Sequence, residues 1–248
     1  MRLLLARHGR TDWNDVRRFQ GTTDVGLSEL GRRQAEALGQ AVRGRRLAAA
    51  YVSPMVRALE TATIALEGTG VPIVPVDELR ELSLGEWEGY TVDEISRRDG
   101  DPYRRWVRAP LDCPPPGGEA LPEVCGRVLR AIEGIGTARR DGDVLIVAHG
   151  GIISVYLCHL LGCSFNELWR LRVDNASLTT VEPPRIVTLN ETFHLIGHRV
   201  TTEARYDDAG SSAGFARAID SGGRQGGASQ RRATTVGRGA KPPSEETA

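Results

Sequence analysis

Short runs of apolar and β-branched residues recur along the chain, and turn residues bound each of them. Runs of this length and composition are typical of strands in a largely buried sheet. They predict six strands, at residues 2–6, 48–53, 72–76, 143–149, 177–183 and 185–190.

Longer segments, in which apolar positions repeat every three or four residues, separate most of these runs and predict helices. Ser28 is placed to cap the first helix. Ser53 and Pro54 are placed to open the second, as its cap and its first helical residue, and Gly68 is placed to end it. The predicted helices cover residues 28–42, 54–68, 119–140 and 149–162.

Strands that alternate with helices in this way predict an α/β fold: a three-layer α/β/α sandwich with a mostly parallel central sheet. Residues 86–120 interrupt the alternation and predict a small helical cap inserted beside the sheet. From residue 209 onward glycine, serine and scattered arginine replace any periodicity. We therefore predict one domain, residues 1–208, followed by a disordered tail, residues 209–248.

Composition and charge narrow the range of functions. The 248 residues carry 32 basic and 32 acidic side chains, a balance that argues against nucleic-acid binding by phosphate neutralisation. No apolar run approaches the roughly 20 residues that span a bilayer, so we expect no membrane segment and a cytoplasmic location. The single lysine, Lys241, precedes Pro242, which excludes a Walker A loop.

The cysteines do not indicate a metal site. No two of them form a CxxC pair, and no histidine cluster accompanies them. Buried thiols are expected instead at Cys113, Cys125, Cys158 and Cys163. No metal and no cofactor is expected.

Basic side chains and histidines follow the predicted strands. Arg7 and His8 close the first strand, Arg57 lies in the first turn of the helix after the second, and His149 and Gly150 follow the fourth. Ligands of open α/β sheets bind beyond the carboxyl ends of the strands, so these residues are expected to share one site.

Such a set suits a phosphomonoester. Guanidinium groups make bidentate contacts with a phosphate dianion, and a neutral imidazole nitrogen can attack phosphorus to give a phosphohistidine. The leaving oxygen then needs a proton, for which Glu81 is the candidate if its surroundings raise its pKa.

Five blocks of sequence, in order, resemble the histidine phosphatase superfamily, in its phosphoglycerate-mutase-like branch. The blocks are Arg7-His8-Gly9-Arg10-Thr11, the stretch from Asn14 to Gln20-Gly21-Thr22-Thr23-Asp24, residues 53–62, residues 79–89 and Ala148-His149-Gly150-Gly151. Together they lie within residues 1–205, the extent of the resemblance.

The resemblance implies a role for each matching residue. His8 would be the phosphorylated nucleophile and Glu81 the proton donor and acceptor. Arg7, Arg57 and His149 would form the phosphate pocket, and Thr11 would support His8. Further contacts with the substrate would come from Asn14, Gln20, Gly21 and Gly150. The implied partner is a small phosphorylated metabolite, and a homodimer is left open.

The substrate remains open between several relatives. Residues 103–107, 117–119, 174–177 and 189–192 look similar to metal-independent phosphoserine phosphatases, whereas Leu84-Gly85-Glu86-Trp87-Glu88-Gly89 equally resembles broad-specificity and α-ribazole phosphatases. Phosphoserine phosphatases of this type can carry histidine where this chain has Leu84, which favours a less polar substrate here. A cofactor-dependent phosphoglycerate mutase and a non-catalytic phosphate-binding or scaffolding relative are the two alternatives.

Overall fold

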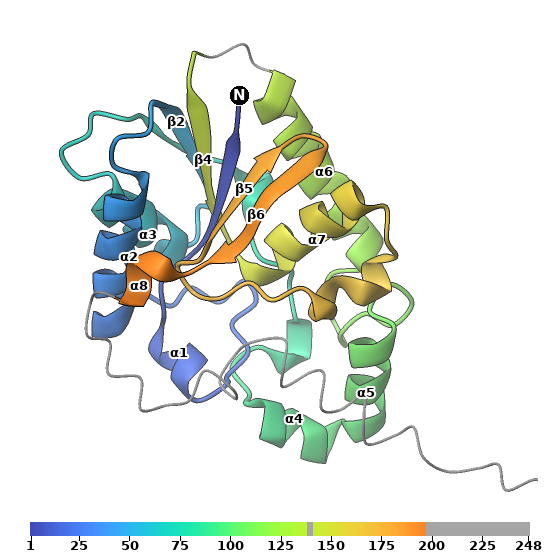
Figure 1. Ribbon diagram of the computed structural model, residues 1–248. Coiled ribbons are helices and arrows are strands. Elements are labelled where there is room, and N and C mark those ends of the chain that lie inside the picture. Colours follow the sequence, from blue (N-terminus) through green and yellow to red (C-terminus); the bar gives the residue numbers. More distant parts are fainter. Residues whose placement is uncertain (138–140, 197–248) are drawn as a thin grey trace, which may run out of the picture.

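The computed structural model describes residues 1–137 and 141–196. Its centre is a six-stranded sheet in the order β3-β2-β4-β1-β5-β6 (Figure 1). β1, β2, β3 and β4 are mutually parallel, whereas β5 and β6 run antiparallel to their neighbours. The strands are β1 (Leu3–Arg7), β2 (Leu47–Val52), β3 (Ile73–Pro75), β4 (Asp143–Ala148), β5 (Leu178–Glu182) and β6 (Arg185–Glu191).

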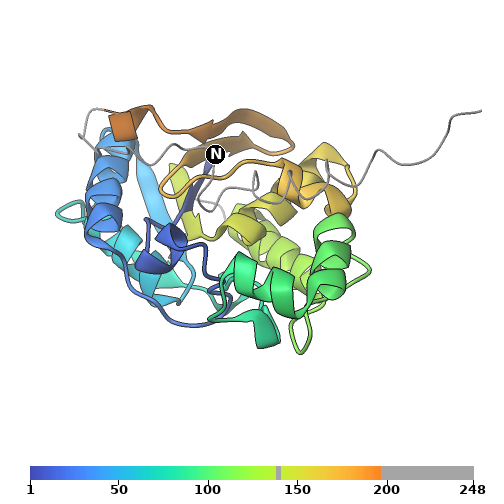
Figure 2. The same cartoon turned by 90° about the horizontal axis from the view of Figure 1, so that it is seen from below.

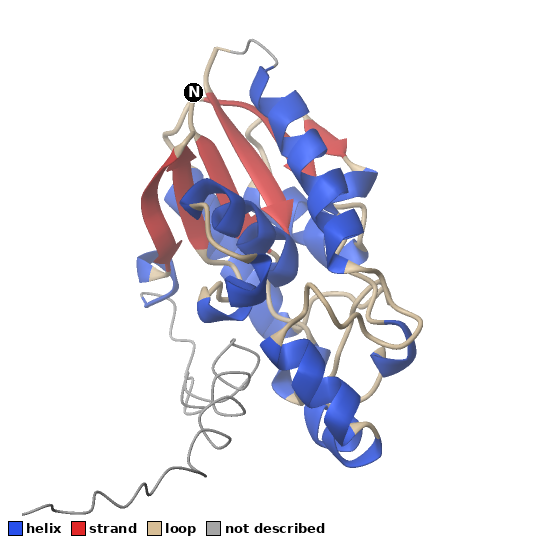
Figure 3. Cartoon of the chain, turned by 90° about the vertical axis from the view of Figure 1, so that its right-hand side faces the viewer, coloured by secondary structure: helices blue, strands red, loops and turns tan. Residues whose placement is uncertain are grey.

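Helices cover both faces of the sheet, as Figures 1 and 3 show, so the predicted three-layer sandwich is confirmed. α2 (Glu29–Val42) packs with α3 (Val56–Ala65) on one face, and α6 (Leu121–Thr137) packs with α7 (Gly150–Leu161) on the other. Side chains alternate between the faces: Leu3 and Leu5 join one apolar cluster, and Leu4 and Ala6 join the other. Central strands buried on both sides explain the continuous apolar runs.

The predicted cap is also present: it lies below the sheet in Figure 1 and on the side that faces the viewer in Figure 2. It contains the 3-10 turn η2 (Gly85–Trp87) and the helices α4 (Val92–Arg98) and α5 (Gly100–Arg108). Trp87, Tyr103 and Trp106 are buried in it and meet edge to face or tilted, with ring centroids 5.4 to 6.3 Å apart. These rings belong to the same apolar cluster as Leu3 and Leu5 of the sheet, so the cap packs onto the main core.

Four short elements complete the described chain: α1 (Asp12–Asp15), the 3-10 turns η1 (Asp77–Leu79) and η3 (Phe165–Arg170), and α8 (Phe193–Ile196). No helix within the two described ranges is long and apolar enough to cross a membrane. The predicted tail, residues 209–248, lies outside the described residues.

Of the two helix starts predicted from capping residues, one is confirmed and one is wrong. Ser28 caps α2 as predicted, since its side chain accepts a hydrogen bond from the backbone N–H of Gly31. The prediction for Ser53 and Pro54 was wrong: α3 begins at Val56, with Met55 as its uncapped N-terminal residue. The Ser53 hydroxyl accepts from the backbone N–H of Met55 at 3.3 Å and is also bonded to His149, at 2.7 Å.

The four cysteines differ in burial. All four are free thiols; Cys125 and Cys158 are buried, as expected, whereas Cys113 and Cys163 are half-buried.

Candidate active site

The two histidines meet because their strands are neighbours. β1 pairs with β4 so that Arg7 lies opposite Ala148, and the backbone N–H of His8 donates to the carbonyl of Ala148 at 3.0 Å. His149 follows at once, and the two imidazole centroids are 5.2 Å apart. Residues 141 positions apart in the sequence therefore share the carboxyl edge of the sheet, as the strand order predicts.

His8 is held as a neutral imidazole. Its side chain is buried, and its Nδ1 lies 2.7 Å from the carbonyl oxygen of Gly9. Because a carbonyl only accepts, Nδ1 carries the proton and Nε2 keeps its lone pair. Burial, together with the charges of Arg57 and Arg7, lowers the pKa of His8 well below its usual value. A neutral imidazole with a free Nε2 is the form that can act as a nucleophile.

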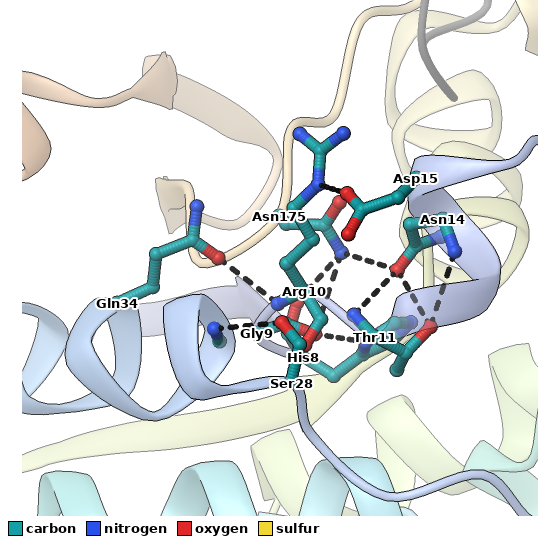
Figure 4. A network of polar contacts seen from close by, with 10 residues as sticks. His8, Gly9, Arg10, Thr11, Asn14, Asp15, Ser28, Gln34 and Asn175 are labelled. Carbon is teal, nitrogen blue, oxygen red and sulfur yellow. Dashed lines mark hydrogen bonds and ion pairs between the residues drawn. The ribbon is translucent and has the colours of Figure 1, made fainter. Parts of the chain in front are cut away.

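A polar network supports the loop after β1 (Figure 4). The N–H of Gly9 donates to Thr61 at 2.9 Å, and that of Arg10 donates to Gln34 at 2.9 Å. Thr11, expected to support His8, caps α1 and exchanges hydrogen bonds with Asn14. The amide oxygen of Asn14 is thereby turned toward the loop.

Two arginines flank His8: Arg57 is buried and Arg7 is half-buried. Arg57 donates from its terminal nitrogens to the carbonyls of Thr23 (2.9 Å) and Gly21 (2.8 Å). Arg7 donates from Nη1 to the carbonyl of Val173 at 2.7 Å. Within the described chain, the buried Nε of each arginine has no hydrogen-bond partner. Both guanidinium groups thus retain N–H groups for an anion.

Burial also affects the charge balance of these groups. It lowers the pKa of Arg57 to about 10, with Arg7 adding to the effect and Glu81 opposing it. Burial likewise lowers the pKa of Arg7. Arg57 still carries its positive charge near neutral pH, and both guanidiniums are buried close enough to repel each other, a repulsion that an anionic ligand relieves.

Glu81 reaches the same place from the chain segment after η1. Its carboxyl oxygens accept from the N–H of Leu82 at 3.0 Å and the N–H of Gly151 at 3.3 Å. Burial raises its pKa above the ordinary glutamate value, and those hydrogen bonds and Arg57 offset only part of the rise. The carboxyl is thereby prepared to hold a proton closer to neutral pH than an exposed glutamate.

His149 is fully buried beside this group. Its Nε2 is bonded to Ser53, and its Nδ1 has no partner in the part of the chain that is described. Burial, Arg57 and His8 lower its pKa well below the usual value. Ser53 therefore fixes the ring of His149, a role that the sequence did not indicate.

The other residues that were predicted to contact the substrate lie around one cavity. Asn14, Gln20, Gly21 and Gly150 line one cavity together with Arg7, His8, Arg57 and Glu81. Gly21 has a left-handed φ of +49°, and a Cβ added there would lie 2.2 Å from Glu88. Glycine is therefore required at this turn. His149 lies against the same group through its contact with His8.

Glu88 is a site-building residue that sequence reasoning missed. Its carboxylate accepts from the N–H of Thr22 (3.0 Å), the hydroxyl of Thr23 (2.8 Å) and the N–H of Leu84 (2.9 Å). Burial works to raise its pKa, but these hydrogen bonds outweigh it and lower the pKa. The ionised Glu88 therefore connects two segments: residues 21–23, whose carbonyls accept from Arg57, and the segment that carries Glu81.

Arg127 is a second residue that supports the site and that sequence reasoning missed. From α6 it donates to the carbonyls of Glu78 (2.6 Å) and Arg80 (2.8 Å), directly before Glu81. It also forms a bidentate pair with Glu119, both contacts at 2.8 Å. Its spacing in the helix matched an ordinary amphipathic pattern, and only the fold shows what it contacts.

The half of the cavity away from the arginines is largely apolar. The rings of Trp106 and Trp169 are 4.9 Å apart at their centroids, and Phe19 meets Trp106 edge to face at 5.8 Å. The wall is completed by residues of the loops and the cap: Leu82, Leu84, Val92, Tyr103, Leu171 and Val173. Two further arginines, Arg17 and Arg18, also line the cavity. One end of the cavity therefore suits an anion and the other an apolar group.

No group of three or more histidine, cysteine, aspartate or glutamate side chains placed to hold a metal ion occurs within residues 1–137 and 141–196.

Gly151 is the subject of a first prediction. A Cβ at this position would lie 2.7 Å from the Glu81 carboxyl and 3.0 Å from Leu82. Gly151→Ala should displace Glu81 and lower kcat/KM for an alkyl phosphate by about tenfold to a hundredfold, the usual effect of a small misplacement. Gly134→Ala on α6 is the matched control, because a Cβ there meets open space. It should gain about 0.5 to 1 kcal/mol of stability at unchanged kcat/KM; equal activity of the two variants would contradict the prediction.

A second prediction concerns acid stability. The pKa of His8 in the folded protein lies below its unfolded value. The unfolded chain thus binds the extra proton first, and the free energy of unfolding falls as pH drops below about 6.5, by up to about 1.4 kcal/mol per pH unit for this one group. Urea unfolding of wild type and His8→Asn between about pH 7.5 and 5.5 measures this. The variant should lose less stability, and parallel curves would refute the assignment.

Fold and cavity together define a class of enzyme. Phosphatases need fixed positive charge for the phosphate and a proton for the leaving oxygen, and the carboxyl edge of this sheet supplies both. The sequence pattern of the histidine phosphatase superfamily (branch 1) matches residues 3–189, and the chain belongs to this superfamily.

Individual relatives agree with this assignment. Phosphoserine phosphatase 1 of Hydrogenobacter thermophilus is 33% identical over 199 residues, which cover 79% of this chain and 94% of that protein. The solved structure of Bacillus stearothermophilus YhfR is 35% identical with a TM-score of 0.74, over 78% of this chain and 98% of that one. A mycobacterial glucosyl-3-phosphoglycerate phosphatase, solved with VO3, is 32% identical with a TM-score of 0.70, over 77% and 99%. The protein is a phosphatase.

Proposed function

We propose that the protein hydrolyses small phosphomonoesters without a metal ion, through a phosphohistidine on His8. The observation that carries the proposal is the state of His8 itself: a buried, neutral imidazole whose Nδ1–H is committed to Gly9, leaving Nε2 free beside Arg57 and Arg7.

In the first step, Nε2 of His8 attacks phosphorus and the bond from phosphorus to the ester oxygen breaks. The Glu81 carboxyl gives its proton to that oxygen, so that an alcohol leaves. Charge on the transferring phosphoryl group is met by N–H groups of Arg7 and Arg57 and by the unbonded nitrogen of His149. Asn14, Gln20 and the Gly150 region complete the pocket.

In the second step, Glu81, now a carboxylate, takes a proton from a water molecule as the water oxygen attacks phosphorus. The bond from phosphorus to Nε2 breaks, inorganic phosphate forms, and both His8 and Glu81 return to their starting states. Two guanidinium groups supply the positive charge that a divalent cation would otherwise bring, and they would repel such a cation.

The apolar half of the cavity supports a substrate with an apolar or aromatic leaving group. Leu84 is buried at 5% exposure and lies on this wall beside Leu82 and the Trp106 ring. The ammonium group of an amino acid leaving group would lose its hydration against these apolar side chains. Its carboxylate could pair with Arg17 or Arg18, which line the same cavity. The apolar wall therefore favours an aryl or alkyl phosphate, and phosphoserine stays the alternative that the two arginines support.

Mutase activity is the enzymatic alternative, and the cap speaks against it. A mutase must hold a second phosphate group and keep water from its phosphoenzyme. Only 29 residues separate Gly89 from Glu119, and two of the five arginines of this stretch, Arg98 and Arg104, form ion pairs with Asp99 and Asp101. Arg17 and Arg18 also line the cavity, but Arg18 already donates to the Gly89 carbonyl and pairs with Glu94 at 3.8 Å.

The test is a panel of phosphomonoesters assayed in EDTA, with released phosphate measured. We expect hydrolysis that survives chelation and a higher kcat/KM for aryl and alkyl phosphates than for phosphoserine. Activity lost in EDTA and restored by magnesium would refute metal independence. With 3-phosphoglycerate and catalytic 2,3-bisphosphoglycerate, rapid formation of 2-phosphoglycerate and little free phosphate would refute hydrolysis as the main activity.

A further inference from the structure

The loop that carries His8 is hydrogen-bonded to a segment far along the chain, the residues just before β5. Residues 174–177, which precede β5, cross the carboxyl end of β1. The N–H of Ala176 lies 3.1 Å from the carbonyl of Arg7 and 3.2 Å from that of His8, and the N–H of Arg7 donates to Ser177 at 3.3 Å. The backbone of this segment therefore sets the position of the strand end.

The side chain of Asn175 goes further into the site. Its amide nitrogen lies 3.1 Å from the His8 carbonyl, 3.4 Å from the amide oxygen of Asn14 and 3.5 Å from the Gly9 carbonyl (Figure 4). These acceptors belong to two different parts of the site. The Gly9 carbonyl is the group that fixes the protonation of the His8 ring, and Asn14 is part of the cavity wall.

The contact with Asn14 decides which way that amide faces. Its oxygen accepts from the N–H and the hydroxyl of Thr11, both at 3.1 Å, and from Asn175. With the oxygen committed in this way, the amide nitrogen of Asn14 is the end left to face a ligand. The orientation matters, because a phosphate oxygen needs a donor and not an acceptor.

We propose that Asn175 is a positioning residue of the phosphatase reaction: its amide holds the His8 loop in register and keeps the donor end of Asn14 turned toward the phosphate. The proposal rests on the function proposed above. Asn175 acts through His8 and Asn14 and does not itself take part in the chemistry.

A control variant can distinguish the effect of the Asn175 amide from the effect of loosening the segment that carries it. Asn190 provides the matched control, since it accepts from the N–H of Asp174 at 2.7 Å and donates to the Asp174 carboxylate at 2.9 Å. Its φ is +54°, so Asn190→Gly removes both contacts without backbone strain. This variant loosens the same segment and leaves the Asn175 amide intact.

The first experiment compares Asn175→Ala with Asn190→Gly on p-nitrophenyl phosphate, at a temperature where thermal melts show both folded. We expect Asn175→Ala to lower kcat by about tenfold with little change in KM, since buried carbonyls lose their donor. Asn190→Gly should stay within about threefold of wild type. Equal effects of the two variants, or no effect of Asn175→Ala, would overturn the proposal.

The second experiment tests the link to Asn14. In Asn175→Asp a carboxylate faces the Asn14 oxygen, so the Asn14 amide should turn its nitrogen away from the phosphate. KM should then rise about tenfold above that of Asn175→Ala, and this extra rise should vanish when Asn14→Ala is added. An extra rise that persists in the double variant would rule out the link.

The two proposals fail in different ways. Normal turnover by His8→Asn would remove the phosphohistidine mechanism, whatever the Asn175 variants do. Full dependence on His8 combined with a normal kcat for Asn175→Ala would leave that mechanism intact and remove the positioning role alone.

Discussion

His8→Asn should reduce hydrolysis of p-nitrophenyl phosphate by at least about a thousandfold, because no other group in the cavity can replace the attacking nitrogen. Asparagine retains a polar side chain of similar size, so the phosphate pocket of Arg7 and Arg57 should still bind the substrate. KM or the inhibition constant of inorganic phosphate should therefore change far less than kcat.

The covalent step can be observed directly. Wild-type protein mixed with a radiolabelled phosphomonoester and quenched in alkali should retain label on the chain, and brief acid treatment should release it. His149→Asn, which keeps the nucleophile but loses a group beside the phosphate, is the control and should still take up label at a lower rate. Label on His8→Asn, or normal turnover by it, would contradict the mechanism.

Glu81→Gln should separate substrates by their leaving groups. An alkyl phosphate releases a basic alkoxide that needs the proton, so its kcat/KM should fall by about 10² to 10⁴-fold. A p-nitrophenolate leaves without help, and its hydrolysis should fall much less. Uniform losses for both substrates would indicate that Glu81 serves structure and not proton transfer.

The pH profile gives the same residue a second test. The pKa of Glu81 is raised by burial, and the acid must be protonated when the ester bond breaks. For an alkyl phosphate, kcat should therefore decline as pH rises through that raised pKa, and Glu81→Gln should lack this decline. A decline of equal size in the variant would assign the titration to another group.

Much of the fold was readable because its signals are local. Central strands buried on both faces give continuous apolar runs, and the helices between them carry their own period and, at Ser28, a working cap. Ser53 shows where local signals fail: its sequence context is that of a cap, but α3 begins only at Val56, and the Ser53 hydroxyl also bonds a buried histidine 96 positions away. The local pattern misplaces the start of this helix and does not report the long-range contact.

The residues of the site likewise fall into those that local signals predict and those that depend on long-range contacts. His8, Arg57 and His149 could be predicted because strand ends and helix starts fix their place relative to the sheet. Glu88, Arg127 and Asn175 could not, because each acts through hydrogen bonds to loops distant in the sequence, which no spacing or composition reports.

The cavity wall has a consequence for how such an enzyme changes its selectivity. Arg7, His8 and Gly150 at the phosphate end lie at the termini of sheet strands, whereas Tyr103 and Trp106 at the other end belong to the cap. Residues 90–108 supply Val92, Tyr103 and Trp106 to the leaving-group end, whereas Phe19, Leu84 and Trp169 reach it from other segments. Exchanging residues 90–108 for the equivalent stretch of a relative should therefore move the substrate preference part of the way toward that of the relative, while the phosphohistidine forms as before. The remaining part of the preference should follow only when the other wall residues are exchanged as well.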